Sequence, residues 1–183
     1  MRQDNLGSKK LPLPIVHIIG LPGSGKTTLA QKLSKKYNLP VFEIGKYRSN
    51  YPISPIGEAD AWIALYRDLS KRKWRNCIVE TTGLNQRESF LRVVLPFAQM
   101  VTIKLEAQRK ILYQRIGGKK RRERGGKWFF SADYPDKYEF VKNLYSKFRK
   151  LPCDIRIDTT KLRTEEVFEI AIEEIEKFKM LFS

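Results

Sequence analysis

A short apolar run followed at once by a glycine-rich loop limits what this chain can fold into more than any other feature. Residues 15–19 read IVHII, which is apolar and rich in β-branched side chains, and this predicts a buried strand. Residues 20–27 read GLPGSGKT and fit the phosphate-binding pattern G-x-x-x-x-G-K-[ST]. Residues 28–37 carry apolar side chains at four-residue spacing, which predicts a helix directly after the loop.

This strand–loop–helix unit predicts a site for a nucleoside triphosphate. Glycines let successive backbone N–H groups turn toward an anion. Lys26 is placed to reach the β- and γ-phosphates, and Thr27 offers a hydroxyl to Mg²⁺. We therefore expect ATP and Mg²⁺ as cofactors. The residues expected to contact the nucleotide are Gly20, Pro22, Gly23, Ser24, Gly25, Lys26, Thr27 and Thr28.

The composition indicates a globular protein with a strong positive charge. The chain has 183 residues, of which 42% are hydrophobic and 31% charged, and this suits a single domain over residues 15–183 after a loose polar leader at 1–14. No apolar run reaches the roughly 20 residues of a membrane helix. Cys77 and Cys153 each lie at the start of an expected strand and lack metal-ligand spacing, which predicts reduced core cysteines and hence a cytoplasmic protein. The net charge of +16 favours polyanionic partners, nucleic acid among them.

The rest of the chain alternates between strand and helix patterns. Strands are expected at residues 41–44, 77–82, 100–105 and 155–158, and helices at 54–73, 86–95, 107–116, 133–151 and from 164 onward. This alternation predicts an α/β fold: a P-loop NTPase three-layer sandwich with a five-stranded parallel sheet covered by helices on both faces. In the helix at 54–73, the expected apolar stripe is Ala59, Trp62, Ile63, Tyr66 and Leu69, with Trp62 in the core.

Polar residues gather where the expected strands end, which is where parallel sheets bind ligands. Glu43 follows the second strand, with Arg48 in the loop that we expect after it. Glu80 lies near the end of the third strand, where it could hold a metal-bound water, act as a general base, or simply be a satisfied polar strand end. His17, inside the first strand, is expected to be a hydrogen-bonded structural residue. Residues 158–161, after the last strand, are expected to border the adenine.

A glycine-flanked basic stretch at about 117–130 is expected to form a lid. Its glycine pairs, at 117–118 and 125–126, suit hinges, and the preceding helix is expected to end at Ile116. The cations that could close over the phosphates are Arg115, Lys119, Arg121, Arg122 and Arg124. A solvated basic run or a nucleic-acid patch is the alternative.

These features resemble the small P-loop kinases, a group that includes nucleoside monophosphate kinases, shikimate-type kinases and polynucleotide 5′-kinases. Three pieces are similar to the kinase module of the phage polynucleotide kinases: Tyr47-Arg48, Thr82-Gly83-Leu84-Asn85, and Arg115 as the first lid arginine. The resemblance implies transfer of the γ-phosphoryl group of ATP, with Lys26, Glu80 and Arg115 as catalytic residues and Thr27 and Glu80 at the metal. The acceptor would lie among Glu43, Tyr47, Arg48, Thr82, Asn85 and Arg87.

The resemblance leaves the acceptor open. The general-base aspartate of the polynucleotide kinases falls on Gly45, so Glu43 or Glu80 would have to replace it for a 5′-hydroxyl acceptor. A nucleoside monophosphate needs no base, and Arg48 and Arg87 look like length-shifted versions of the arginines that hold it. The charge and the Thr-x-Leu-Asn match favour a polynucleotide 5′-hydroxyl. A third hypothesis is a nucleotide-switched ATPase that binds RNA or a protein partner. The sequence does not decide the oligomeric state.

Overall fold

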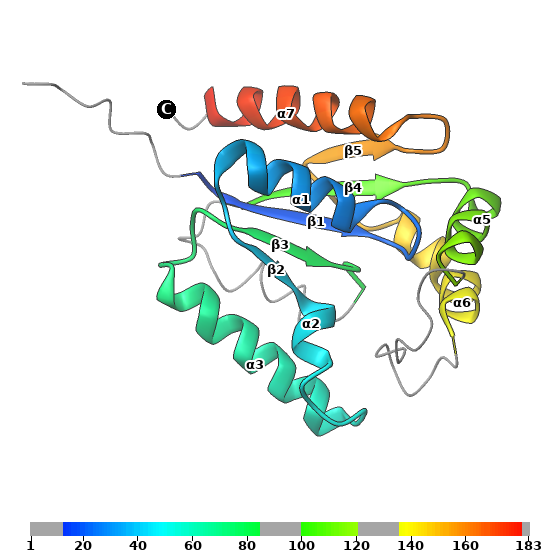
Figure 1. The fold of residues 1–183 in the computed structure, drawn as a ribbon, viewed down its shortest axis with the longest axis horizontal. Helices are drawn as coiled ribbons and strands as arrows, with labels where there is room; N and C mark the ends of the chain where they lie inside the picture. Colours follow the sequence, from blue (N-terminus) through cyan, green and yellow to red (C-terminus); the bar gives the residue numbers. More distant parts are fainter. Residues whose placement is uncertain (1–12, 85–99, 121–135, 181–183) are drawn as a thin grey trace, which may run out of the picture.

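The computed structural model describes residues 13–84, 100–120 and 136–180. Figure 1 shows the strands β1 (Ile15–Gly20), β2 (Val41–Glu43), β3 (Ile78–Thr81), β4 (Met100–Glu106) and β5 (Ile155–Asp158). The helices are α1 (Lys26–Tyr37), α2 (Ile44–Arg48), α3 (Pro55–Lys71), α5 (Arg109–Lys120), α6 (Lys137–Arg149) and α7 (Thr164–Met180). Residues 1–12 of the leader expected at 1–14, and the helix expected at 86–95, lie outside the described residues.

The strands form one parallel sheet in the order β2-β3-β1-β4-β5. β1 lies in the middle, paired with β3 through Val16↔Ile78 and with β4 through Val16↔Val101. All six residues of β1 are buried, which explains why its sequence is a continuous apolar run rather than an alternating one. The predicted five-stranded parallel sheet is confirmed.

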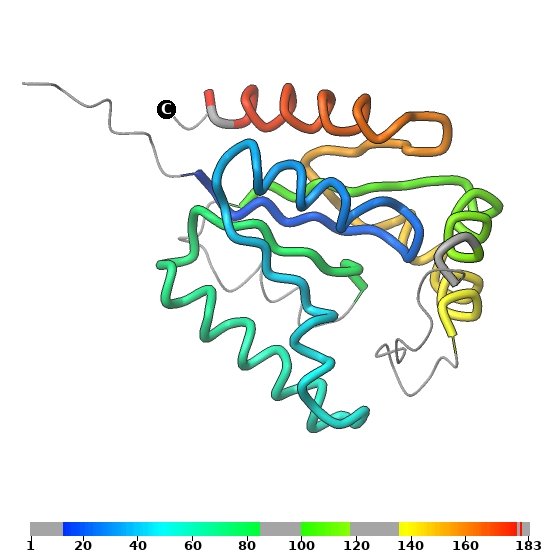
Figure 2. Tube along the Cα trace, viewed as in Figure 1, coloured from blue at the N-terminus to red at the C-terminus, as the bar shows by residue number. Residues whose placement is uncertain are grey.

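Helices cover both faces of the sheet, and the side chains of β1 alternate between them. Val16 and Ile18 pack with α1 and α7 on one face, whereas Ile15 packs with α3 on the other. In the tube view, α1 and α7 run side by side above the sheet and α3 runs below it (Figure 2). Trp62 of α3 is fully buried, so its assignment to the core is confirmed.

Two predictions of where helices begin and end are wrong. Helix α2 takes in Ile44, which was expected to end the strand, and residues 45–48, which were expected in a loop, because buried Ile44 anchors a helical turn that the glycine at 45 does not prevent. Helix α5 continues past Ile116 to Lys120, through Gly117 and Gly118. A side chain at Gly117 would approach the Tyr138 hydroxyl of α6 to 3.1 Å, so close packing of α5 on α6 accounts for this glycine.

The buried stripe of α3 is rotated from the expected one. The buried residues after its first turn are Ala61, Trp62, Leu65 and Leu69, whereas Ile63 is 52% exposed. Apolar residues surround much of this helix, so the sequence does not define which face is buried.

The turn from α3 into β3 contains three non-glycine residues in the left-handed region. Lys73, Trp74 and Asn76 have φ values of 54°, 55° and 54°. This conformation costs roughly 1–2 kcal/mol for each residue that has a Cβ. Hydrogen bonds hold the turn in place, from Trp74 N to Leu69 O (3.1 Å) and from Asn76 N to Leu13 O (2.9 Å). The turn is therefore fixed at both ends.

Two buried polar side chains join elements that are distant in the sequence. His17 Nε2 lies 2.8 Å from Thr81 Oγ1, as expected for a structural histidine. Lys104 of β4 is fully buried, and its ammonium donates to the backbone carbonyls of Arg149 (3.0 Å) and Leu151 (2.9 Å) at the end of α6. The same ammonium lies 2.7 Å from Glu106 Oε1. Lys104 thus fixes α6 to the sheet.

The two cysteines are free thiols in different surroundings. Cys77 is fully buried just before β3, and burial raises the pKa of its thiol to about 12. Cys153 is half-buried, so it is not the core residue that the sequence suggested. Among the helices of the described residues, none combines the length and the apolar character needed to cross a bilayer.

Candidate active site

The loop between β1 and α1 has the geometry of an anion-binding loop. Gly23 and Gly25 have φ values of 84° and 97°, which side chains rarely adopt. A Cβ on Gly23 would also come within 2.8 Å of the Leu112 carbonyl oxygen of α5. Gly25 caps the N-terminus of α1, so the backbone N–H groups of the first turn of that helix face the loop. The loop therefore offers a positive concavity for phosphate groups.

Lys26, Thr27 and Glu80 meet beside this loop. Thr27 Oγ1 donates to Glu80 Oε1 at 2.9 Å, and Lys26 Nζ lies 3.9 Å from the same oxygen. Lys26 Nζ also donates to the Leu21 carbonyl at 3.3 Å. The side chains of Lys26 and Glu80 are only 12% and 11% exposed. Because water is largely excluded, the charges of this group act strongly on any ligand that enters it.

The oxygen donors beside the loop suit Mg²⁺. This ion keeps several waters and is usually held by one or two carboxylates together with substrate phosphates. The Thr27 hydroxyl and the Glu80 carboxylate supply two hard oxygen donors next to the phosphate loop. No group of three or more His, Cys, Asp or Glu side chains that could hold a metal occurs within residues 13–84, 100–120 and 136–180. The donor set therefore fits Mg²⁺ bound together with a phosphate ligand.

A cavity of about 400 Å³ opens against the other side of the loop. It lies between the loop, the start of α1, α5, and the connection from β5 to α7. Its lining residues are Gly23, Ser24, Gly25, Thr28, Leu29, Arg115, Thr159, Leu162, Thr164 and Val167. The apolar part of this lining, together with the hydroxyl and guanidinium groups, suits a nucleotide base and its phosphates.

Arg115 is held at the rim of this cavity by Thr159. Its guanidinium donates to Thr159 Oγ1 at 3.0 Å and to Thr159 O at 2.6 Å. Thr159 N in turn donates to Glu106 O at 2.8 Å, which extends the sheet by one bond. Arg115 and Thr159, both expected at the nucleotide from the sequence, therefore line one cavity, whereas no sequence pattern predicted that Leu162 and Val167 would line it.

The side chains after β2 form a separate hydrogen-bonded group. Arg48 donates to Glu58 through two bonds, from Nε (2.8 Å) and from Nη2 (2.6 Å). Trp62 Nε1 donates to Glu58 Oε1 at 2.8 Å. The sequence reading missed Glu58, although its position four residues before buried Trp62 on α3 was a usable signal. The charge of Arg48 is thus largely matched within the protein.

Tyr47 is turned toward α3, and Glu43 carries an exposed cation. The Tyr47 hydroxyl donates to Asp68 Oδ2 at 2.8 Å, and burial together with this bond raises the pKa of Tyr47. A hydrogen bond from Lys71, assisted by that from Tyr47, lowers the pKa of Asp68. Glu43 Oε1 lies 2.6 Å from Lys46 Nζ, and the Glu43 side chain is 17% exposed.

Glu43 and Glu80 are neighbours at the end of the sheet. They are paired in register between β2 and β3. Val41 packs on the α1 side of the sheet and Phe42 on the α3 side, so Glu43 returns to the α1 side, where Thr27 meets Glu80. Adjacent strands are about 4.8 Å apart, which brings the two carboxylates to the same corner of the site.

The remaining predicted site residues are buried or outside the described parts. Thr82 is buried, with 4% exposure, directly after β3. Lys119 lies within α5 in a part of the helix where side chains are not described. Outside the described residues lie Asn85, Arg87, Arg121, Arg122 and Arg124, and with them most of the predicted lid.

Comparison with known proteins shows the fold of the chain. A family described as "AAA domain" matches residues 19–47, which contain the phosphate loop. No curated protein sequence matches the chain. Among solved structures, a gluconokinase from Sinorhizobium meliloti is 15% identical with a TM-score of 0.64, and the match covers 92% of this chain and 95% of that one.

Two further solved structures have a fold similarity to this chain of nearly the same degree. The shikimate kinase from Acinetobacter baumannii, in complex with shikimate, is 16% identical with a TM-score of 0.63, over 91% of this chain and 95% of that one. The APS kinase from Mycobacterium tuberculosis, in complex with AMPPNP and APS, is 16% identical with a TM-score of 0.62, over 90% and 98%. At such identities the similarity establishes the fold alone. The chain has the α/β P-loop NTPase fold.

Proposed function

We propose that this chain is an ATP-dependent kinase that transfers the γ-phosphoryl group to a hydroxyl group of its acceptor. One observation carries the proposal: Lys26 and Thr27, at the end of a complete phosphate loop, meet Glu80 at distances of 3.9 and 2.9 Å. Phosphoryl transfer depends mainly on positioning and on charge neutralisation, which these three side chains could supply together. The nucleotide would enter the cavity of about 400 Å³ beside the loop.

In this reaction the acceptor oxygen forms a bond to the γ-phosphorus, and the bond from that phosphorus to the β,γ-bridging oxygen breaks. ADP leaves with the electron pair of the broken bond. Lys26 would neutralise charge on the transferred group, and Arg115 would contact the phosphates from the rim of the cavity. Thr27 and Glu80 would hold Mg²⁺, which when bound neutralises phosphate oxygens.

A hydroxyl acceptor must lose a proton, and Glu43 is the best candidate to take it. Glu80 is already engaged by Thr27 and Lys26. Glu43 lies in register with Glu80 on the next strand, and among the described residues the cation that pairs with it is Lys46, whose side chain is 71% exposed. Glu43 would therefore replace the aspartate that the sequence lacks at Gly45.

The acceptor side of the site favours a hydroxyl compound over a nucleoside monophosphate. Glu58 binds Arg48 through two hydrogen bonds, so the positive charge expected to hold an acceptor phosphate is already matched. The similarity to structures named gluconokinase and shikimate kinase supports a small acceptor. A polynucleotide 5′-hydroxyl is the second candidate, favoured by the net charge of +16 and by the segment Thr82-Gly83-Leu84-Asn85.

One assay separates these acceptors. ATP labelled in its γ-phosphate is offered with small hydroxy acids and polyols, with 5′-hydroxyl oligonucleotides, with each nucleoside monophosphate, and with water alone. Label transfer to a hydroxyl compound supports the proposal. Transfer only to monophosphates contradicts it, and slow hydrolysis that no acceptor stimulates indicates a nucleotide-switched ATPase.

We expect the change Glu43→Gln to lower kcat for a hydroxyl acceptor by about 10²-fold or more, because general-base catalysis contributes about 10²- to 10⁴-fold. The KM for ATP should stay the same, since Glu43 lies on the acceptor side. Steady-state kinetics measure both values. The change Glu139→Gln, which removes an exposed carboxylate from α6, is the control. An unchanged kcat for Glu43→Gln would remove Glu43 from the reaction.

We expect the change Arg48→Ala to raise the KM for a hydroxyl acceptor up to about tenfold and to leave the KM for ATP unchanged, because a guanidinium neutralised by Glu58 no longer favours a phosphate but can still donate a hydrogen bond to an acceptor oxygen. Arg48→Lys keeps the charge and so limits any loss of stability from leaving Glu58 without a cation. Arg67→Ala, at an exposed cation of α3, is the charge-matched control. Equal increases of both KM values would mean that Arg48 is not an acceptor residue.

A further inference from the structure

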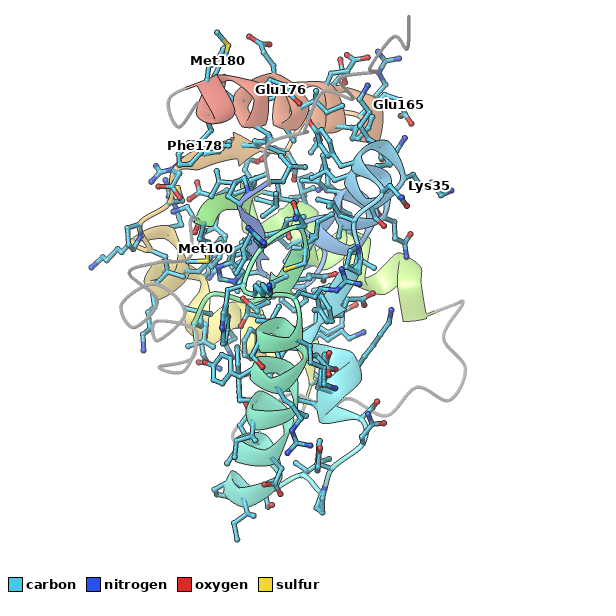
Figure 3. The ribbon with its side chains drawn as sticks, turned by 90° about the vertical axis from the view of Figure 1, so that its left-hand side faces the viewer. Lys35, Met100, Glu165, Glu176, Phe178 and Met180 are labelled. Carbon is cyan, nitrogen blue, oxygen red and sulfur yellow. The ribbon has the colours of Figure 1, made fainter. Side chains whose placement is uncertain are left out.

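The end of the sheet opposite the phosphate loop carries a group of exposed cations that the kinase proposal does not use. Helix α1 ends with Lys35 and Lys36, and the region where α3 turns into β3 carries Lys71, Arg72, Lys73 and Arg75. All six side chains are exposed. We call these six residues the basic edge. Figure 3 views the molecule from this side, with α3 running down the centre and Lys35 projecting from α1.

Backbone contacts bring the two parts of the basic edge together. Ile78 N donates to Pro40 O at 2.9 Å, which joins the turn after α3 to the connection after α1. The guanidinium of Arg72 lies 6.0 Å from the centre of the Phe42 ring on β2, between the two. The two helix ends that carry the basic edge are therefore joined through β2 and β3 at the same end of the sheet.

The turn after α3 carries more cations than are needed to stabilise the C-terminal end of that helix. Cations at Lys35, Lys36 and Lys71 stabilise the C-terminal ends of their helices. Arg72 is the C-cap of α3, whereas Lys73 and Arg75 lie beyond the end of the helix and gain little from its dipole. Asp68 is the only acid between residues 67 and 76, and it already accepts bonds from Lys71 and Tyr47.

The strained backbone of the turn is a second, independent observation. Lys73 has a φ of 54°, a conformation in which glycine would be favoured, yet the chain has a long cation there. The hydrogen bonds of Trp74 and Asn76 keep the turn rigid, so its cations are presented in a fixed arrangement. Strain of this kind concentrates at functional positions.

We propose that the basic edge binds the phosphodiester backbone of a nucleic acid. This goes beyond the proposed kinase activity and does not require the acceptor to be a polynucleotide. A bilayer surface fits less well, because the apolar side chain of the turn, Trp74, is half-buried with its ring 6.2 Å from that of Tyr66. Among the described residues, the exposed large apolar side chains all lie outside the turn, at Ile53, Ile56, Ile63 and Met180.

The test uses a single-stranded oligonucleotide of about 20 nucleotides with a 5′-phosphate and a 3′-fluorescein, so that it cannot serve as a 5′-hydroxyl acceptor; binding is followed by anisotropy across a salt series. The double change Lys73→Gly with Arg75→Gln should weaken binding about tenfold at 0.1 M salt. It should also lower the slope of log K against log salt by about 1.4, which is 0.7 for each lost phosphate contact.

Two comparisons keep the result specific. The change Lys142→Gln with Lys147→Gln removes the same charge from exposed positions of α6 and should alter affinity less than twofold. Glycine adopts the left-handed conformation of residue 73 without strain. The change Lys73→Gly should therefore not lower the free energy of unfolding below that of the parent protein. Equal weakening by both double changes, or no weakening by the first, would overturn the proposal.

Two further experiments distinguish nucleic-acid binding at the basic edge from membrane binding and from the proposed kinase activity. Tighter binding to vesicles containing phosphatidylserine than to the oligonucleotide, lost in the Lys73→Gly/Arg75→Gln variant, would assign the surface to membranes and overturn the nucleic-acid proposal. The Lys26→Ala variant should bind the oligonucleotide like the parent protein, and the Lys73→Gly/Arg75→Gln variant should keep the phosphoryl-transfer rate. Failure of the kinase proposal would therefore leave this result unaffected.

Discussion

Replacing Lys26 with alanine is expected to lower kcat for phosphoryl transfer by about 10³-fold or more. Transfer depends on neutralising charge that develops on the phosphoryl group, and a single cationic contact is worth about 10³-fold in comparable sites. Lys26 is placed for this role, since its ammonium lies 3.9 Å from Glu80 and its side chain is only 12% exposed. The measurement is single-turnover transfer of labelled γ-phosphate with saturating acceptor.

The fold should survive this change. Lys26 is the first residue of α1, where alanine is a good helix former, and Glu80 keeps its hydrogen bond from Thr27. The control is Lys32→Ala on the same helix, which removes a lysine paired with Glu165 at the surface. A Lys26→Ala variant that keeps more than a tenth of the parental rate would refute the site.

The change Lys104→Met should lower the free energy of unfolding by about 3 kcal/mol or more, which is typical when one partner of a buried ion pair is removed. Methionine has nearly the same length but leaves Glu106 and the carbonyls of Arg149 and Leu151 without the ammonium. It also removes the cation 5.6 Å from the centre of the Phe148 ring. Urea unfolding followed by tryptophan fluorescence measures the effect.

Two further variants test the cause. Lys142→Met removes an exposed lysine that pairs with Glu139 on α6, and it should change stability by less than about 1 kcal/mol. Adding Glu106→Gln to Lys104→Met should recover part of the loss, because the Glu106 carboxylate, which loses the ammonium at 2.7 Å and keeps Arg156 at 3.8 Å, then carries no charge. A loss below about 1 kcal/mol for Lys104→Met would show that the bonds to α6 contribute little.

The sequence predicted the sheet and the phosphate loop because both depend on local patterns. A continuous apolar run at 15–19 and the glycine spacing at 20–27 each have a direct physical meaning. Alternation of strands and helices then determined that the sheet is parallel. The sequence could not determine which face of α3 is buried, because Ile63 and Leu65 are equally apolar and only packing separates them.

The hydrogen bonds between side chains and groups that are distant in the sequence could not be predicted from the sequence. Arg115 donates to Thr159, which lies 44 residues further along the sequence, and Lys104 donates to the carbonyl of Arg149, 45 residues further along. Lys104 would be assigned to a solvated strand face from its charge alone, yet it is fully buried, since its β4 strand is covered on both sides. Such pairs follow from the way distant elements pack together, which local patterns do not encode.

The different burial of the two thiols allows local opening of the protein to be followed by chemical modification. Cys77 is shielded at the start of β3, and a pKa of about 12 keeps almost none of it as reactive thiolate at neutral pH. An alkylating reagent can modify it only after that strand separates from its neighbours. Half-buried Cys153 should be modified earlier, and its modification serves as the reference for the time at which Cys77 reacts. The interval between the two modifications reports how often the start of β3 opens to solvent, with no probe added to the chain.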